Sequence, residues 1–587
     1  MSVVTETTAT EPPPGTAISQ TLLDNAANRR LCAGAYVDRE FRDSVLRKVY
    51  SDRSRRVAPS YGFNVVLVLR HAWRAWWLET SQHLLVLALL VIACVKMPLD
   101  TVIVVGVVVI WYVLRVMRSW AREMVHFYSG RSKVFSDQQL KARGKLMRNT
   151  LLCSLVVIAV AAAAAANNAN RHGNATEPWP MRSGLVNAAL LLVAFAVIVS
   201  AGAAARMILL GRLDAIDVGL RRRDGRRMSV IDAQQYHPFT VYSGFKPFIG
   251  SGVNVRSWSF AQRLIHRKVL DTEADREYGQ PPFTTRDLVD RLKKMIDGLR
   301  DDKNLETRLP GLTVRDHVFI EGTHAATLHD VLVAGPDSAE VANAILNAIA
   351  CPSDVARHYL AARVESWGGE VVTSVFVHVS LQGRTLYLEF ATYALLPTRA
   401  DYHVIDEAGG TGAGATGKAI GSALIQLPEQ LLGMRRLVNV PIRLWVALSP
   451  RKDRTSMITA RMNSAQRHIR SFSILRPVDI GAVTSAREIA AAQSDESYFQ
   501  FQDILQHSKV IERRLIATVG DYLKEVGVDT SEFWQRASAI LNTGVINAGS
   551  GTVNITSSAI GDQATVMTTA EQPQSSEGSA AQQGTTI

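Results

Sequence analysis

The sequence predicts a protein in two parts: an α-helical membrane domain of four transmembrane helices arranged as two hairpins, and an α+β cytoplasmic domain after it. Three observations support this fold class. Long apolar runs are confined to residues 82–211 of the 587. Basic residues flank these runs asymmetrically, and the remainder mixes strand and helix patterns without a regular βαβ repeat.

Four apolar runs carry the prediction of membrane helices, at 84–95, 102–114, 151–166 and 185–205. The first two are separated by the polar segment Lys96–Asp100. Together they are too long for one crossing of a hydrocarbon core of about 30 Å, so we expect a tight hairpin of two short spans. Because backbone polar groups find no water in the bilayer core, each run should be helical.

Lys and Arg residues set the expected orientation. They concentrate before the first run, between the second and third runs, and after the fourth. By the positive-inside rule, both termini are therefore cytoplasmic, and we predict a multi-pass protein of the plasma membrane. No ionisable residue lies in the middle of a run, which favours anchoring and homo-oligomer formation over transport. The net charge of +12 is then explained by topology and anionic lipid, and we expect no nucleic-acid partner.

The polar residues do not predict a metal site. The four cysteines are scattered and include no CxxC pair, so neither a zinc site nor a disulfide framework is expected. Acidic and histidine side chains crowd the segment between Asp316 and Asp330, but HExxH is absent. We interpret these side chains as solvated or internally satisfied polar groups.

Composition divides the chain into five segments. Residues 1–28 form a polar, disordered N-terminus without signal-peptide features, and 29–81 a basic cytoplasmic or interfacial segment. Residues 82–211 form the transmembrane domain, 212–541 the cytoplasmic α+β domain, and 542–587 a low-complexity tail.

Within the cytoplasmic domain the clearest pattern is a β-hairpin over 371–396, where apolar residues alternate on both sides of a turn at Gln382 and Gly383. Periodicity also predicts helices and strands elsewhere. The helices are expected at 288–299, 339–350 and 498–526, and the strands at 316–322 and 442–448.

An aromatic segment at 236–260, interspersed with Pro and Gly, predicts loops or short strands instead of a helix. Loops often carry binding residues, so this segment is a candidate recognition loop. The alternative, favoured by the general tendency of aromatics to lie inside, is packing against the domain core. The candidate partner-binding residues are Tyr242, Phe245, Phe248 and Trp258.

A glycine-rich segment at 409–421 matches two phosphate-loop patterns, GxGxxG and GxxxxGK. The candidate cofactor-binding residues are Gly412, Gly414, Gly417 and Lys418. Against this interpretation, Ala419 offers no hydroxyl for magnesium, and Pro428 interrupts the following helix. We therefore expect a flexible glycine-rich loop and no cofactor.

The tail segment 544–566 alternates small polar and β-branched residues, and its only charge is Asp562. This texture partly matches the signature of cross-β stacking, and it resembles the short amyloid-signalling tails of some bacterial defence proteins. The alternative is a linker or a strand docked on its own domain. The whole chain resembles uncharacterised multi-pass membrane proteins of high-GC Gram-positive bacteria, chiefly through YSGFKPFIGSG at 242–252. That resemblance implies a plasma-membrane location.

These observations predict an integral plasma-membrane protein that anchors a cytoplasmic partner-binding or sensing domain. Its expected partners are the lipid bilayer, further copies of the chain and a cytoplasmic protein. One alternative is a membrane-acting defence or stress effector that self-assembles through its tail. Another is a nucleotide-dependent enzyme built on the glycine-rich segment, although the sequence favours a protein without catalytic activity.

Overall fold

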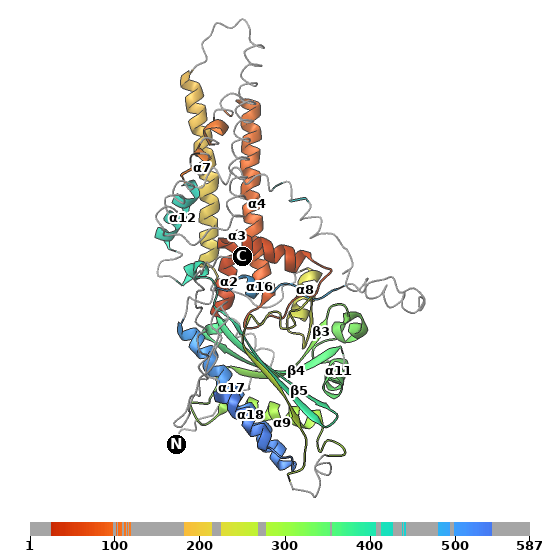
Figure 1. The fold of residues 1–587 in the computed structure, drawn as a ribbon. Coiled ribbons are helices and arrows are strands. Elements are labelled where there is room, and N and C mark those ends of the chain that lie inside the picture. Colours follow the sequence, from red (N-terminus) through yellow and green to blue (C-terminus); the bar gives the residue numbers. More distant parts are fainter. Residues whose placement is uncertain are drawn as a thin grey trace, which may run out of the picture.

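The structure is a computed structural model, in which two long helices project from a domain built on one β-sheet (Figure 1). It describes residues 25–97, 181–213, 225–267, 278–352, 355–406, 412–425, 479–492 and 498–542, with isolated positions between 101 and 118 and at 437, 440 and 441. The predicted strand at 442–448 and the predicted self-associating tail at 544–566 lie outside the described residues, and both stay predictions.

The sheet has six strands in the order β1-β3-β4-β5-β6-β2. Its strands are β1 (Phe239–Tyr242), β2 (Val253–Arg263), β3 (Leu312–Glu321), β4 (Ala356–Ser366), β5 (Val371–Gln382) and β6 (Thr385–Leu395). Only β1 and β3 pair in parallel, and every other neighbouring pair is antiparallel. The predicted hairpin is confirmed as β5 and β6, joined by a turn in which Gly383 has a φ of 58°.

The helices fall into a group on the sheet and a group made of the two projecting helices and those packed against them. The first group is α9 (Thr285–Asp297), α10 (His329–Val333), α11 (Ala339–Ala350), α17 (Tyr498–Glu525) and α18 (Ser531–Asn542). The second is α2 (Ala26–Val37), α3 (Arg39–Val45), α4 (Val65–Lys96), α7 (Met181–Gly211), α8 (Arg226–Gln235), α12 (Ala413–Ile425) and α16 (Ala486–Ile489). The predicted helices at 288–299, 339–350 and 498–526 are confirmed as α9, α11 and α17.

The main core lies between one face of the sheet and α9, α17 and α18. Helix α9 forms because its apolar residues recur at helical spacing, and a capping box between Thr284 and Asp287 closes its first turn. Leu288 and Leu292 of this stripe are fully buried against the alternate, inward-facing residues of β4, β5 and β6. Together with the mixed sheet, this arrangement is the α+β organisation expected for the residues after the apolar runs.

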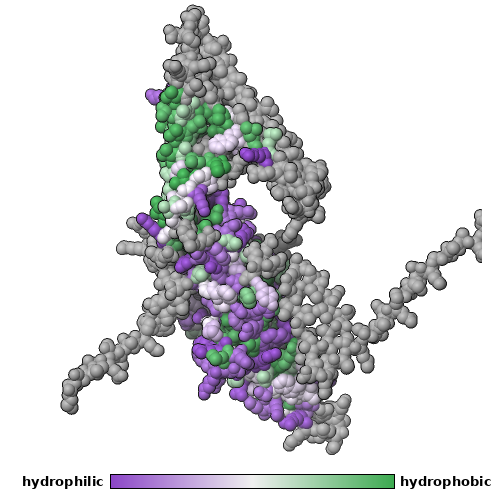
Figure 2. Space-filling model, turned by 90° about the vertical axis from the view of Figure 1, so that its left-hand side faces the viewer, coloured by the Kyte–Doolittle hydropathy of each residue, from purple (hydrophilic) through white to green (hydrophobic). Residues whose placement is uncertain are grey.

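Helix α4 belongs to both the sheet-containing domain and the projecting pair. It is one continuous helix of 32 residues, capped by the Asn64 side chain. Its first half is buried among α2, α3 and α8. Its second half turns large apolar side chains outward, with Leu85 59% exposed, Ile92 60% and Val95 75%. Figure 2 shows hydrophobic residues gathered on this outer part of the molecule, above a mostly hydrophilic domain.

Helices α4 and α7 pack side by side in opposite directions. Near the domain, Met207 and Leu210 of α7 join the core that holds the first half of α4. Farther out, Phe195 of α7 packs with Val86 of α4. The domain-side ends of the pair are therefore the beginning of α4 and the end of α7.

The prediction of four transmembrane helices is wrong. Among the described residues two helices are long and apolar enough to cross a membrane, Val65–Lys96 and Val186–Gly211. The first apolar run is only the outer part of α4, and the apolar residues of its first half pack into the core at the base of the projecting helices. The run at 102–114 is described at isolated positions alone, and the run at 151–166 lies outside the described residues.

Candidate functional site

The loop between β1 and β2, residues 243–252, crosses the face of the sheet that α9 and α17 leave uncovered. Phe248 anchors it there, with its ring 4.6 Å from that of Phe376 and 4.8 Å from that of Tyr393. Phe319 and Tyr359 complete the aromatic cluster with edge-to-face contacts. Such offset and edge-to-face contacts stabilise aromatic pairs beyond simple burial, so the sheet fixes the loop through one side chain.

Two glycines allow this loop to lie close to its neighbours. Gly250 and Gly252 both have a φ of 90°, a backbone angle that residues with a side chain rarely adopt. A Cβ on Gly250 would lie 2.7 Å from the carbonyl oxygen of Pro59, and one on Gly252 would lie 2.1 Å from that of Ala394. The loop backbone therefore contacts both the segment before α4 and the end of β6.

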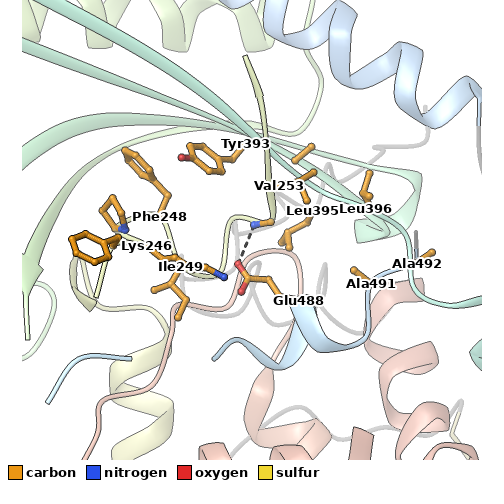
Figure 3. A pocket seen from close by; sticks show the side chains of 14 residues that line it. Lys246, Phe248, Ile249, Val253, Tyr393, Leu395, Leu396, Glu488, Ala491 and Ala492 are labelled. Atoms are coloured by element: carbon orange, nitrogen blue, oxygen red, sulfur yellow. Dashed lines mark hydrogen bonds between the residues drawn. The ribbon is translucent and has the colours of Figure 1, made fainter. Parts of the chain in front are cut away.

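A cavity of about 450 Å³ opens between this loop, the last residues of β6 and the helix α16 (Figure 3). Its apolar walls include Phe248, Ile249, Leu396 and Ala491. Phe245 and Lys246 lie at its exposed edge. The volume is within the range of small-molecule sites, which are mostly apolar with a few placed polar groups.

Glu488 of α16 is the principal polar group of the cavity. Its Oε1 accepts hydrogen bonds from the backbone N–H groups of Gly250 at 2.7 Å and Gly252 at 3.2 Å. Burial raises the pKa of this carboxyl above its ordinary value, although the two amides and Lys246 oppose that shift. Its Oε2 makes no hydrogen bond with any described residue, so it can accept a hydrogen bond from a donor group of a ligand.

Arg487, the residue beside Glu488, connects α16 to the end of β6 and the turn before β5. Arg487 is fully buried, and its Nη2 donates to the carbonyl oxygens of Glu370 at 2.6 Å and Leu396 at 2.8 Å. The Glu370 carboxylate lies 3.9 Å from Arg487 and 3.5 Å from Arg30 of α2. Helix α16 thus lines the cavity and also contacts α2.

Small residues on α16 complete this connection. Ala486 and Ala490 are buried in the same cluster as α2 and the first half of α4. The cavity and the base of the projecting helices therefore share one wall. Sequence reasoning missed Glu488 and Arg487, which lie in a short Ala-rich stretch without a periodic pattern.

The structure brings three of the four predicted partner-binding residues to this region. Phe245 and Phe248 line the cavity, and Tyr242 packs beside Ile249 just outside it. Trp258 lies on the helix-covered face, stacked 5.1 Å from Phe390, and its Nε1 donates to Glu512 at 2.7 Å. A partner-binding role for these residues stays a prediction.

The expectation of a flexible glycine-rich loop is wrong, because the segment forms helix α12 from Ala413 onward. Gly412 precedes the helix, and its carbonyl accepts from the N–H of Thr416 at 2.9 Å. A Cβ on Gly414 or Gly417 would meet nothing within 4 Å, so no close approach explains these glycines. Helix α12, which includes Lys418, packs along α7. Nucleotide binding by this segment stays a prediction.

The acidic and histidine side chains of β3 point to opposite faces of the sheet. Asp316 bonds to Lys293 at 2.5 Å and to His358 at 2.9 Å. Burial would raise the pKa of Asp316, but these two partners outweigh it and lower the pKa to about 2. His317 contacts Thr240 on the other face, at 2.7 Å. In the part of the chain that the structure describes, no group of three or more His, Cys, Asp or Glu side chains could hold a metal ion.

Comparison with known proteins gives one match. A family model described as an AbeC-like domain matches residues 257–554. The match begins inside β2, so it includes Tyr393 and Glu488 of the cavity but not the 243–252 loop. No curated protein and no solved structure matches the chain.

Proposed function

The chain belongs to the AbeC-like domain family, and from that premise we propose a membrane-anchored sensing protein that binds a small molecule in the cavity beside Glu488. One observation carries the proposal. Helix α16 lines the cavity with Glu488, and its Ala486 and Ala490 pack into the core that holds the first half of α4. A ligand that moves α16 would therefore act on the base of α4.

The chemistry of the cavity defines the ligand class. Its walls favour a ligand with an aromatic or branched apolar group. The Oε2 of Glu488, which has no hydrogen-bond partner among the described residues, favours an amine or hydroxyl at one end of that ligand. A carboxylate at that end would be repelled whenever Glu488 is ionised. We therefore propose an amphipathic small molecule with a hydrogen-bond-donating head.

The two projecting helices supply the proposed anchor. Because α4 leaves the domain and α7 returns to it, a membrane crossed by this pair would have the domain on one side. Arg39, Arg42, Arg206 and Arg212 lie toward the domain-side ends of these helices. By the positive-inside rule we propose that this side is cytoplasmic, that the membrane is the plasma membrane and that both termini are cytoplasmic.

Membrane insertion is tested by extracting cell membranes with alkaline carbonate, which removes peripheral proteins. The full chain should stay in the membrane pellet, because burying the apolar surface of the two helices in lipid is favourable by about 25 cal/mol per Å². Leu85→Arg and Ile92→Arg together should release it, because each places a charge on the exposed face of α4. Recovery of the wild-type chain in the soluble fraction would refute the anchor.

Ligand binding is tested by calorimetric titration of the full chain in lipid nanodiscs with tryptamine and with indole-3-acetate, which share one apolar body. Tryptamine should bind about tenfold more tightly, because a charge-assisted hydrogen bond to Glu488 contributes roughly 1.5 kcal/mol or more. Ala491→Trp fills the cavity and should abolish binding. Val483→Trp, at an exposed position outside the lining, is the matched control. Equal binding of the two probes, or binding retained by Ala491→Trp, would refute the site.

A further inference from the structure

Three arginines gather where the projecting helices leave the domain. Arg39 and Arg42 belong to α3, and Arg206 belongs to the domain-side part of α7. All three lie close enough to Glu79 of α4 to interact with it electrostatically. The large exposed apolar side chains of α4 begin near this level, with Trp77 48% exposed, and continue from Leu84 onward.

The pairing within this cluster is unequal. Arg42 donates to Oε2 of Glu79, and Arg39 pairs with both carboxylate oxygens. Asp43 lies 3.7 Å from Arg42 and offsets part of its charge. Arg206 has no carboxylate within ion-pair distance among the described residues. The three guanidinium groups and the two carboxylates therefore carry a net charge of +1.

The environment of Arg206 is defined by contacts between α4 and α7. Its Nη2 donates to Oε1 of Gln82 at 3.2 Å, and its Nε is buried without a partner among the described residues. Gly202, one turn earlier on α7, leaves room for Gln82, since a Cβ there would lie 2.3 Å from Oε1. The helix pair thus holds Arg206 in place through Gln82, while its Nη1 makes no hydrogen bond with a described residue and can bind a ligand.

We propose that Arg206, assisted by Arg39, binds the phosphate group of an anionic phospholipid, whose acyl chains follow the exposed apolar face of α4. Guanidinium groups hold phosphate through paired hydrogen bonds, and basic sites at the cytoplasmic ends of membrane helices recognise lipid head groups. Leu84 and Leu85, 47% and 59% exposed, lie within two turns of Glu79 and would contact the chains. The inference rests on the membrane placement in the proposed function.

The test uses the full chain in detergent, titrated with dioctanoyl phosphatidylglycerol and, separately, dioctanoyl phosphatidylcholine, with bound lipid counted by native mass spectrometry. The wild-type chain should bind the anionic lipid at least fivefold more tightly. Arg206→Gln should remove about fivefold of that affinity, the size expected for one basic side chain at an anionic surface. Arg206→Lys should retain most of it because the charge remains.

Arg212→Gln is the matched control, because Arg212 is an exposed arginine on the turn that ends α7. It should leave the affinity unchanged. Thermal melting of each variant separates loss of binding from loss of folding. Equal affinity for the two lipids, or equal losses in Arg206→Gln and Arg212→Gln, would overturn the proposal.

A third titration, with inorganic phosphate, separates the two sources of the phosphate group. Phosphate should fail to displace the lipid at equal concentration, because it cannot use the apolar face of α4. Displacement at equal concentration would overturn the lipid assignment. Short-chain lipids bind in detergent without a bilayer, so failure here is distinguishable from failure of membrane insertion, which carbonate extraction reports independently.

Discussion

The two faces of the sheet differ in what covers them and in what they contribute. Helices α9, α17 and α18 cover one face, and the residues that β5 presents to them are aliphatic: Val375, Val377 and Val379. A loop and the segment before α4 cover the other face, which presents Phe376 to Phe248. The helix-covered face supplies continuous apolar burial, whereas the loop-covered face carries the cavity.

Buried polar groups occur on both faces, and on the helix-covered face Glu512 accepts from Trp258 and His358 bonds to Asp316. On the loop-covered face, the guanidinium of Arg363 lies 3.7 Å above the ring of Tyr61, and His317 bonds to Thr240. Such polar groups stabilise the fold less than buried aliphatic groups do, and each needs a suitably placed hydrogen-bond partner. The geometry around them therefore depends on a few specific contacts. One set of strands thus packs a largely aliphatic core on one side and borders a cavity on the other.

The largest expected effect is on the helix-covered face. Phe390→Ala removes a fully buried ring that stacks on Trp258, and the rigid surroundings cannot collapse onto the space. We expect a loss of about 3–5 kcal/mol in the free energy of unfolding, measured by denaturant titration in detergent. A loss below about 1 kcal/mol would contradict the assignment of this face as the main core.

Truncating the corresponding ring on the loop-covered face should cost less. Phe248→Ala removes a buried side chain, but the loop can partly close over the gap, so we expect about 2–3 kcal/mol. The same change should abolish tryptamine binding, because Phe248 forms a wall of the cavity. The comparison fails if Phe248→Ala destabilises the protein more than Phe390→Ala does.

A polar interaction on the helix-covered face should have a smaller, pH-dependent effect. Asp316→Asn removes the ion pair with Lys293 and the bond from His358, and we expect a loss of about 1 kcal/mol at neutral pH after allowing for solvent screening. Because partners lower the pKa of Asp316 from 3.8 to about 2, this stabilisation is present above pH 3.8 and is lost as pH falls toward 2. Melting temperatures of the two proteins should converge over that interval. A constant difference would contradict the ion-pair account.

The smallest stability effect is expected in the cavity. Glu488→Gln keeps an oxygen for the amides of Gly250 and Gly252 and removes a buried charge. Because the folded-state pKa of Glu488 is raised, its contribution to stability is greatest below its ordinary pKa and is lost as pH rises through the raised value. At neutral pH the variant should match or slightly exceed the wild type, by under about 0.5 kcal/mol, and fall behind it in acid. If the melting temperatures of the wild type and Glu488→Gln shift equally with pH, the folded-state pKa of Glu488 is not raised.

The sequence was informative wherever a pattern is local and periodic. The alternation at 371–396 and the capped stripe of α9 depend on neighbours along the chain, and both predictions are confirmed. The aromatic segment at 236–260 also identified Phe245 and Phe248, which the structure places at the cavity. Alternation alone could not show that Trp258 faces the helices.

The rest depends on contacts between distant segments. Hydropathy does not distinguish a helix surface buried in protein from one exposed to lipid, so the apolar run at 84–95 gave no sign that α4 begins at Val65 inside a core with α2 and α3. Trp76, which precedes that run, is likewise buried in this core. Glu488 gains its position only when α16 meets the loop at 250–252, which no local pattern encodes.

Helix α16 joins the cavity and the base of the projecting helices into one structural unit. Amide hydrogen exchange on the full chain in nanodiscs, comparing the wild type with Ala491→Trp, measures this coupling. Filling the cavity should change protection in α16 and also in α2 and the first half of α4, residues 65–76, because these pack in one cluster. Changes confined to the 243–252 loop and the end of β6 would contradict the account.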